Sequence, residues 1–250
     1  AFHSGHEGRP EVRPDLALDE CTRGRGEDPF TGRWSVMSDN RAIAHYSRFE
    51  CDLNRPRHNA VYQNPEDAWG IEVWKSPLPP EIVEHSLVRY DRFYHRMQRL
   101  IESLLKRHPR LVILDLHTYN HRRAGPDSEP EDPRENPEIN LGTGSLNRDR
   151  WAAVVDRFHS DLVKFDFLGR SLDVRENVRF QGGELAKWVH ARYPQSVCVL
   201  AIEVKKFFMN EWTSEIDPQQ YAAVLRALWS AVPGQLEVLG ALRRGTFRAA

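Results

Sequence analysis

The stretch LVILDLH at residues 111–117 is a short apolar run that ends in two polar side chains, Asp115 and His117. Its length and its β-branched core predict a buried strand. The stretch VCVLAIEV at residues 197–204 repeats this pattern and is apolar except for Glu203. Because such runs alternate with helical segments, the sequence predicts a single α/β domain over residues 1–250, with a mixed, mostly parallel central sheet flanked by helices.

Helical periodicity agrees with this fold class. The longest predicted helix begins at Pro79-Pro80 and ends before Pro109, with apolar residues at a spacing of three to four. Further helices are predicted near 148–166, 183–193 and 217–231, and further strands near 42–51, 170–174 and 196–204. Residues 5–40, 56–80 and 120–140 show little periodicity and are expected to form long loops. The last of these is rich in proline and acidic residues and is expected to be a mobile flap or crossing loop.

Composition and charge narrow the range of functions. A net charge of −1 and a pI near 6.9 give no electrostatic reason to expect a nucleic acid or an anionic membrane as partner. No stretch approaches the roughly 20 apolar residues of a membrane span. The three cysteines lack CxxC spacing, which favours a reducing compartment and hence a cytoplasmic protein. A strand normally leads into a histidine placed like His3, so we expect further residues upstream of Ala1.

Two histidines, His3 and His117, lie where apolar strands end, and ligands of parallel sheets collect beyond these ends. Two imidazoles and one carboxylate, with a position left for water, form the usual catalytic zinc site. Asp115 lies on the same face of the strand as His117 and is placed to orient its ring. The alternative for each histidine is a structural hydrogen bond at a strand end. The candidates for the third ligand are Asp28 and Glu7, followed by Glu27 and His6.

Glu203 stands alone in an apolar strand, where an unpaired carboxylate is costly. It is either part of a structural salt bridge with an arginine or a general base whose pKa is raised by burial. Arg48 and the pair Asn54-Arg55 accompany the strand predicted at 42–51, and their donors suit a carboxylate or a developing oxyanion. The alternative is that the arginines pair with Asp52 or Glu50 at the surface.

These segments, in this order, resemble the N-formylglutamate amidohydrolase family, whose fold looks like that of the zinc carboxypeptidases in the phosphorylase/hydrolase class. The most specific match is the run from Tyr46-Ser47-Arg48-Phe49 through Asp52-Leu53-Asn54-Arg55-Pro56. The other matching stretches are Phe2-His3-Ser4-Gly5, the Glu27-Asp28 neighbourhood, Asp115-Leu116-His117, Gly142-Thr143, Gly182-Gly183 and Ile202-Glu203.

The resemblance implies a role for each candidate residue. His3, Asp28 and His117 would bind Zn²⁺, and Glu203 would act as general base and then as general acid. Arg48 would polarise the scissile carbonyl, and Asn54 and Arg55 would bind a carboxylate of the substrate.

The implied protein is a zinc-dependent hydrolase of an amide bond next to a free carboxylate, acting on a small N-formyl or N-acyl amino acid such as N-formylglutamate. A metallocarboxypeptidase that acts on peptide C-termini is one alternative, and a non-catalytic metal-dependent module that binds carboxylates is another. The sequence departs from the family in the 120–140 loop and in the residues directly after Asp28, where the pocket could be reshaped.

Overall fold

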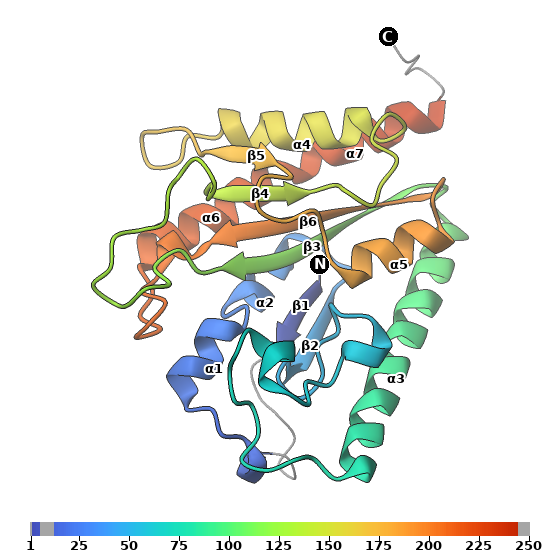
Figure 1. Ribbon diagram of the computed structural model, residues 1–250. Helices are drawn as coiled ribbons and strands as arrows, with labels where there is room; N and C mark the ends of the chain where they lie inside the picture. The colour runs from blue at the N-terminus through green and yellow to red at the C-terminus, as the bar shows by residue number, and fades with distance from the viewer. Residues whose placement is uncertain (1, 6–12, 245–250) are drawn as a thin grey trace.

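Strands β3 (Leu111–Tyr119) and β6 (Val197–Lys205) pair along their whole length and form the centre of a six-stranded sheet. The other strands are β1 (Phe2–Gly5), β2 (Ala42–Ser47), β4 (Ile139–Gly142) and β5 (Val174–Glu176). The order across the sheet is β2-β1-β3-β6-β4-β5, and every neighbouring pair is parallel except β4 with β6 (Figure 1). This computed structural model describes residues 2–5 and 13–244, with side chains from 14 to 242. The expected α/β class with a mixed, mostly parallel sheet is confirmed.

Helices cover both faces of this sheet. Alternate residues of β6 point to opposite faces, so Val197 and Val199 pack against α3 (Pro80–Leu105) and α5 (Glu184–Arg192). Cys198, Leu200 and Ile202 belong to a second core with α4 (Ala152–Lys164), α6 (Pro218–Ser230) and α7 (Val232–Arg244). Because both faces are covered, β6 reads as an almost continuous apolar run. None of the helices in the described part of the chain is long and apolar enough to cross a membrane.

Several predicted boundaries are wrong. The region 5–40 is not all loop, because it contains α1 (Glu20–Gly26) and α2 (Thr31–Trp34). The strand predicted over 42–51 ends at Ser47, where Glu50 and Cys51 donate backbone hydrogen bonds to its carbonyl and form a turn. The strand predicted at 170–174 lies at 174–176, and the predictions omitted β4 and α7. Short helices and short strands carry too few residues for a periodicity to be recognised.

Candidate active site

A row of three polar side chains crosses the sheet near the carboxyl ends of its central strands. His117 of β3 pairs with Glu203 of β6, and Glu203 pairs in turn with Asn140 of β4. Paired residues of neighbouring strands direct their side chains to the same face, so the three lie on the face that α3 and α5 cover. These three polar side chains therefore lie side by side across the sheet.

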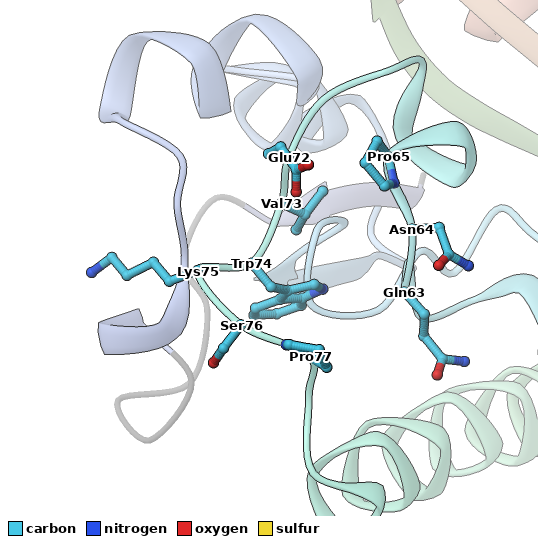
Figure 2. A pocket seen from close by; sticks show the side chains of 9 residues that line it. All are labelled: Gln63, Asn64, Pro65, Glu72, Val73, Trp74, Lys75, Ser76 and Pro77. Atoms are coloured by element: carbon cyan, nitrogen blue, oxygen red, sulfur yellow. The ribbon is translucent and has the colours of Figure 1, made fainter.

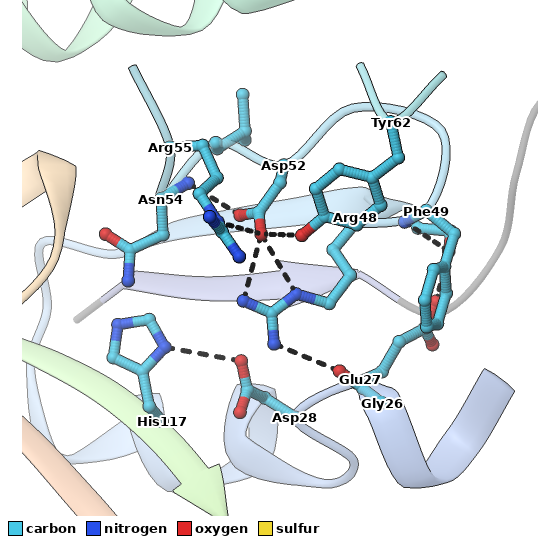
Figure 3. Close-up of polar contacts among 12 residues, drawn as sticks. Gly26, Glu27, Asp28, Arg48, Phe49, Asp52, Asn54, Arg55, Tyr62 and His117 are labelled. Atoms are coloured by element: carbon cyan, nitrogen blue, oxygen red, sulfur yellow. Dashed lines mark hydrogen bonds and ion pairs between the residues drawn. The ribbon is translucent and has the colours of Figure 1, made fainter. Parts of the chain in front are cut away.

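Asp28 lies against His117, although the two are far apart in the sequence. His117 Nδ1 is 3.2 Å from Asp28 Oδ2 (Figure 3). Its Nε2 is 3.0 Å from Asp115 Oδ1. Thr118 donates its backbone N–H to Asp28 Oδ1 at 2.8 Å. Asp28, Asp115 and His117 are all buried. The predicted contact between Asp115 and the ring of His117 is therefore present, and the ring is held between two carboxylates.

The segment that carries Asp28 is fixed by a buried lysine. Lys206 directly follows β6, and its Nζ donates to the backbone carbonyls of Arg25 at 2.8 Å and Glu27 at 3.0 Å. Beyond Asp28, Phe30 adopts a left-handed conformation with φ 67° and turns the chain into α2. The position of Asp28 is thus set by the end of β6 and by a backbone conformation that a non-glycine residue rarely adopts.

Burial and neighbouring charges act in opposite directions on the two buried acids Glu203 and Asp28, with a different outcome for each. Burial raises the pKa of Glu203 to about 7, against the lowering effect of the His117 charge. Burial also disfavours the Asp28 carboxylate, but the hydrogen bond and charge of His117, with Arg48, hold its pKa well below the usual range. No described side chain donates a hydrogen bond to Glu203. Asp28 is therefore ionised near neutral pH, whereas Glu203 can exchange a proton there.

Arg48 is partly buried, and its guanidinium is bound within the protein. Its Nε and Nη2 donate to Asp52 Oδ2 at 3.2 and 3.1 Å, and its Nη1 donates to the Gly26 carbonyl at 3.0 Å. The Tyr62 hydroxyl donates to the same oxygen of Asp52. Arg48 thus pairs with Asp52, which is one of the two partners expected from the sequence. Three of its five N–H groups are used, so two remain to meet a substrate.

Asn54 lies over the start of α5. Its Oδ1 accepts the backbone N–H of Leu185 at 3.3 Å, and its backbone carbonyl accepts that of Glu184 at 3.3 Å. A Cβ at Gly183 would come within 2.1 to 2.3 Å of the Asn54 amide, so only glycine leaves room for this approach. Gly182-Gly183 is therefore a helix start that admits the Asn54 side chain.

Arg55 is the accessible cation of the cluster. Its side chain is 37% exposed, and its Nε is 4.0 Å from Asp52 Oδ2. The guanidinium lies 5.8 Å from the ring centroid of Tyr62 and 5.7 Å from that of Trp69. Arg55, Asn54 and Arg48 all lie on the side of Asp52 that faces His117 (Figure 3). A carboxylate entering from solvent would therefore meet Arg55 before the buried residues.

Two of the described residues, Asp28 and His117, lie close enough together to be ligands of one zinc ion. Zinc–ligand bonds of about 2.0 Å in a tetrahedral shell place neighbouring ligand atoms about 3.3 Å apart, close to the 3.2 Å between His117 Nδ1 and Asp28 Oδ2. Asp115 on the opposite ring nitrogen is the usual partner of a metal-binding histidine. His3 has its backbone in β1, between β2 and β3. The side chain of His3 lies outside the described residues, as do Glu7 and His6. Among the described side chains alone, there is no group of three that could bind a metal ion.

Of the alternative acids, Glu27 has a different partner. Its buried carboxylate accepts the Ser47 hydroxyl of β2. The structure thus brings together Asp28, His117, Glu203, Arg48, Asn54 and Arg55. Sequence reasoning missed Lys206 and Tyr62, and treated Asp52 only as a surface partner. The position of Lys206 directly after a buried strand could have indicated a role in the site, whereas nothing in the sequence indicated one for Tyr62.

A small cavity of about 170 Å³ lies beside this cluster, between residues 63–65 and residues 72–77 (Figure 2). Trp74 lines it and donates its indole N–H to the carbonyl of Tyr62 at 2.7 Å. None of the predicted site residues lines this cavity. It therefore borders the segment that carries Tyr62 and lies apart from Asp28 and His117.

The fold and the cluster define an α/β protein with a buried acid–imidazole site at the carboxyl edge of its sheet. A family model described as N-formylglutamate amidohydrolase matches residues 1–209. The chain therefore belongs to the N-formylglutamate amidohydrolase family, as the resemblance in the sequence predicted. This membership supports a hydrolase activity.

Two solved structures are similar in fold. An N-formylglutamate amidohydrolase from Ralstonia eutropha JMP134 superposes with a TM-score of 0.71 at 18% identity, covering 97% of this chain and 92% of that one. A gene product of Agrobacterium tumefaciens has a TM-score of 0.65 at 16% identity, covering 96% and 90%. Comparison with curated proteins gave no match. At these identities the two structures support the fold.

Proposed function

We propose that this protein is a zinc-dependent hydrolase of an amide bond next to a free carboxylate, with small N-formyl or N-acyl amino acids such as N-formylglutamate as substrates. The family match supports amide hydrolysis, and the name of the Ralstonia protein supports the substrate class. The observation that carries the proposal is the contact of Asp28 with His117, in one row with Glu203 and facing Arg55.

Asp28 and His117, together with His3, would hold the zinc ion. When bound, such an ion acts as a Lewis acid that makes water more acidic and polarises a carbonyl group. Asp115 orients the His117 ring through Nε2, and Lys206 fixes the backbone that presents Asp28.

Glu203 would act as the base and then as the acid. It takes a proton from the attacking water as the carbon–oxygen bond forms, and gives that proton to the leaving nitrogen as the carbon–nitrogen bond breaks. The products are a carboxylic acid and a free amino acid. A pKa near 7 suits both transfers, because the group is then neither a very weak base nor a very weak acid at neutral pH.

Arg55 and Asn54 would bind the carboxylate of the substrate. Arg55 is exposed enough to meet it, and the rings of Trp69 and Tyr62 lie within cation–π distance of its guanidinium. The remaining N–H groups of Arg48 lie near Asp28 and are available to the carbonyl oxygen that becomes negative during attack.

The test is hydrolysis by the metal-free protein to which zinc is added back. N-formylglutamate and N-acetyl amino acids are compared with the same compounds carrying amidated carboxyl groups, and the released amine is measured. We expect zinc-dependent turnover of the free acids and at least tenfold weaker activity on the amides, since one charge-assisted contact contributes roughly 1.5–3 kcal/mol. Equal activity with and without zinc would refute the metal dependence.

Glu203→Gln separates catalysis from metal binding. We expect a normal zinc content and a decrease in turnover of at least about 100-fold, the lower range for loss of a positioned proton-transfer group. Full activity of this variant would exclude Glu203 as the base. Hydrolysis of tripeptides and longer peptides would instead favour a carboxypeptidase, and tight binding of peptides without hydrolysis would favour a carboxylate-binding module.

A further inference from the structure

An exposed aromatic side chain borders the arginines of the candidate site. Trp69 is 58% exposed. The centroid of its ring lies 5.5 Å from the guanidinium carbon of Arg48 and 5.7 Å from that of Arg55. The ring also meets that of Tyr62 at a steep angle, with centroids 6.1 Å apart. Trp69 therefore presents a large apolar surface to solvent, directly beside two guanidinium groups.

The backbone holds Trp69 in this position at a conformational cost. Its φ of 58° and ψ of 31° are left-handed, a conformation that a bulky residue rarely adopts. Trp69 ends the short helix η4 (Pro65–Ala68), and the side chains of Asn64 and Asp67 close the start of that helix in a capping box. Trp69 and Gly70 both donate their backbone N–H groups to the carbonyl of Pro65. The turn thus presents a tryptophan where glycine or asparagine would be less strained, and such residues are concentrated at binding sites.

In the proposed reaction, the two arginines bind the two ends of one unit of the substrate. Arg55 binds the carboxylate, and Arg48 lies near the carbonyl oxygen of the amide. The amide nitrogen and the Cα atom join these two groups, and that Cα carries the amino-acid side chain. Because the ring of Trp69 is about equally far from both guanidiniums, the substituent nearest to it is the side chain on that Cα.

We propose that Trp69 is a specificity-determining residue, which contacts the side chain of the bound N-formyl or N-acyl amino acid and favours large apolar and aromatic side chains over small ones. This inference rests on the proposed function, which supplies the place of the carboxylate. Apolar surface of the indole and of the substrate leaves water when the two meet, and two aromatic rings gain further from edge-to-face or offset packing. A glutamate side chain gains less from this contact than an apolar side chain of similar length.

The test is ligand binding measured by isothermal titration calorimetry. The protein is the Glu203→Gln variant with zinc supplied, so that the ligands are not consumed. N-formylphenylalanine should bind at least about fivefold more tightly than N-formylalanine, the order of magnitude of one aromatic contact. N-benzoylalanine carries its ring on the acyl group and should gain less. Equal affinities for the two formyl compounds, or a larger gain for N-benzoylalanine, would refute the contact with the side chain.

Variants of Trp69 locate the preference. Trp69→Asn removes the ring and suits the left-handed backbone, so the protein should fold, and the ratio of the two dissociation constants should approach one. Trp69→Phe should keep most of the preference. The matched control is Trp229→Ala, because Trp229 is 52% exposed on α6, which covers the other face of the sheet, and the ratio should not change. A merely structural role would weaken all ligands equally, so a ratio that persists in Trp69→Asn would overturn the assignment.

Failure of this inference and failure of the proposed function give different results. Binding with the expected ratio, by a protein that hydrolyses neither formyl compound with zinc, would retain the role of Trp69 and refute the catalytic proposal. Zinc-dependent hydrolysis with the same KM for both compounds would refute the role of Trp69 alone. Absence of binding by all three compounds would refute both.

Discussion

Replacing Gly183 by alanine tests the close approach of Asn54 to the start of α5. The new Cβ would lie 2.1 Å from Oδ1, 2.2 Å from Nδ2 and 2.3 Å from Cγ of Asn54. Separations this short cannot persist, so the amide must move and give up its hydrogen bond with Leu185. The backbone at Gly183 has φ −96°, which alanine tolerates, and the effect is therefore steric.

The expected magnitude follows from three contributions. Overpacking a well-filled site costs about 1–3 kcal/mol. Alanine lowers the conformational entropy of the unfolded chain, which stabilises the folded protein by about 0.4–1 kcal/mol. Loss of the hydrogen bond destabilises it by about 1 kcal/mol. We expect Gly183→Ala to destabilise the protein by about 2 kcal/mol. In an Asn54→Ala background the three close atoms are gone, so the same substitution should be neutral or slightly stabilising.

The assay is urea unfolding of the four proteins of this double-mutant cycle, followed by tryptophan fluorescence. We expect a coupling energy of about 2 kcal/mol between the two positions, with unchanged m-values. If the two substitutions are additive within about 0.5 kcal/mol, Asn54 does not occupy the space at Gly183, and its role in the site must be revised. In the active protein, Gly183→Ala should also raise KM for carboxylate substrates, because Asn54 is displaced.

Three further predictions concern buried polar groups. Burial lowers the pKa of His190 to about 4 from the 6.5 of an unfolded chain, so the stability that the neutral ring contributes above pH 6.5 is lost as the pH falls toward 4. The loss is about 3 kcal/mol and should be absent in His190→Gln. Lys206→Met should reduce stability by about 1–3 kcal/mol and weaken zinc binding measured by chelator competition, because the segment carrying Asp28 loses its donor. Tyr62→Phe removes the hydroxyl that donates to Asp52 and should lower stability by about 1 kcal/mol and reduce kcat/KM, because Asp52 also holds Arg48.

Each of these predictions has an outcome that would contradict it. His190→Gln with the same pH dependence between 6.5 and 4 as the parent would assign the loss to other groups. Lys206→Met with unchanged zinc affinity would show that the buried ammonium does not position Asp28. An unchanged kcat/KM for Tyr62→Phe would show that the Tyr62 hydroxyl does not position the arginines through Asp52.

The core of the fold could be predicted because its elements are long. The helix over Pro80–Leu105 and the strands Leu111–Tyr119 and Val197–Lys205 each repeat their pattern over enough residues to be recognised. The helices at 20–26 and 31–34 were missed because each has at most two turns, and α1 has no buried residue that would mark a periodic face. Their positions depend on tertiary contacts such as the Lys206 hydrogen bonds.

The site could be predicted only in part. Residues at the ends of apolar runs, such as His117 and Glu203, were recognisable because a polar group is conspicuous there. The partner of Arg48 was left open between surface pairing and a substrate role, and the structure gives it Asp52. The sequence ranked Asp28 ahead of Glu27 as the third ligand, but only the structure shows that the Asp28 carboxylate meets His117 whereas that of Glu27 meets Ser47.

The sequence by itself determined the α/β class, the family and the set of polar residues at strand ends, because periodicity and short motifs are local properties of the chain. Only the tertiary structure decided that Asp28 meets His117, which lies 89 positions further along the chain, and that Gly183 makes room for Asn54. These outcomes depend on the register of the strands and on the packing of distant segments, and no local pattern encodes either one.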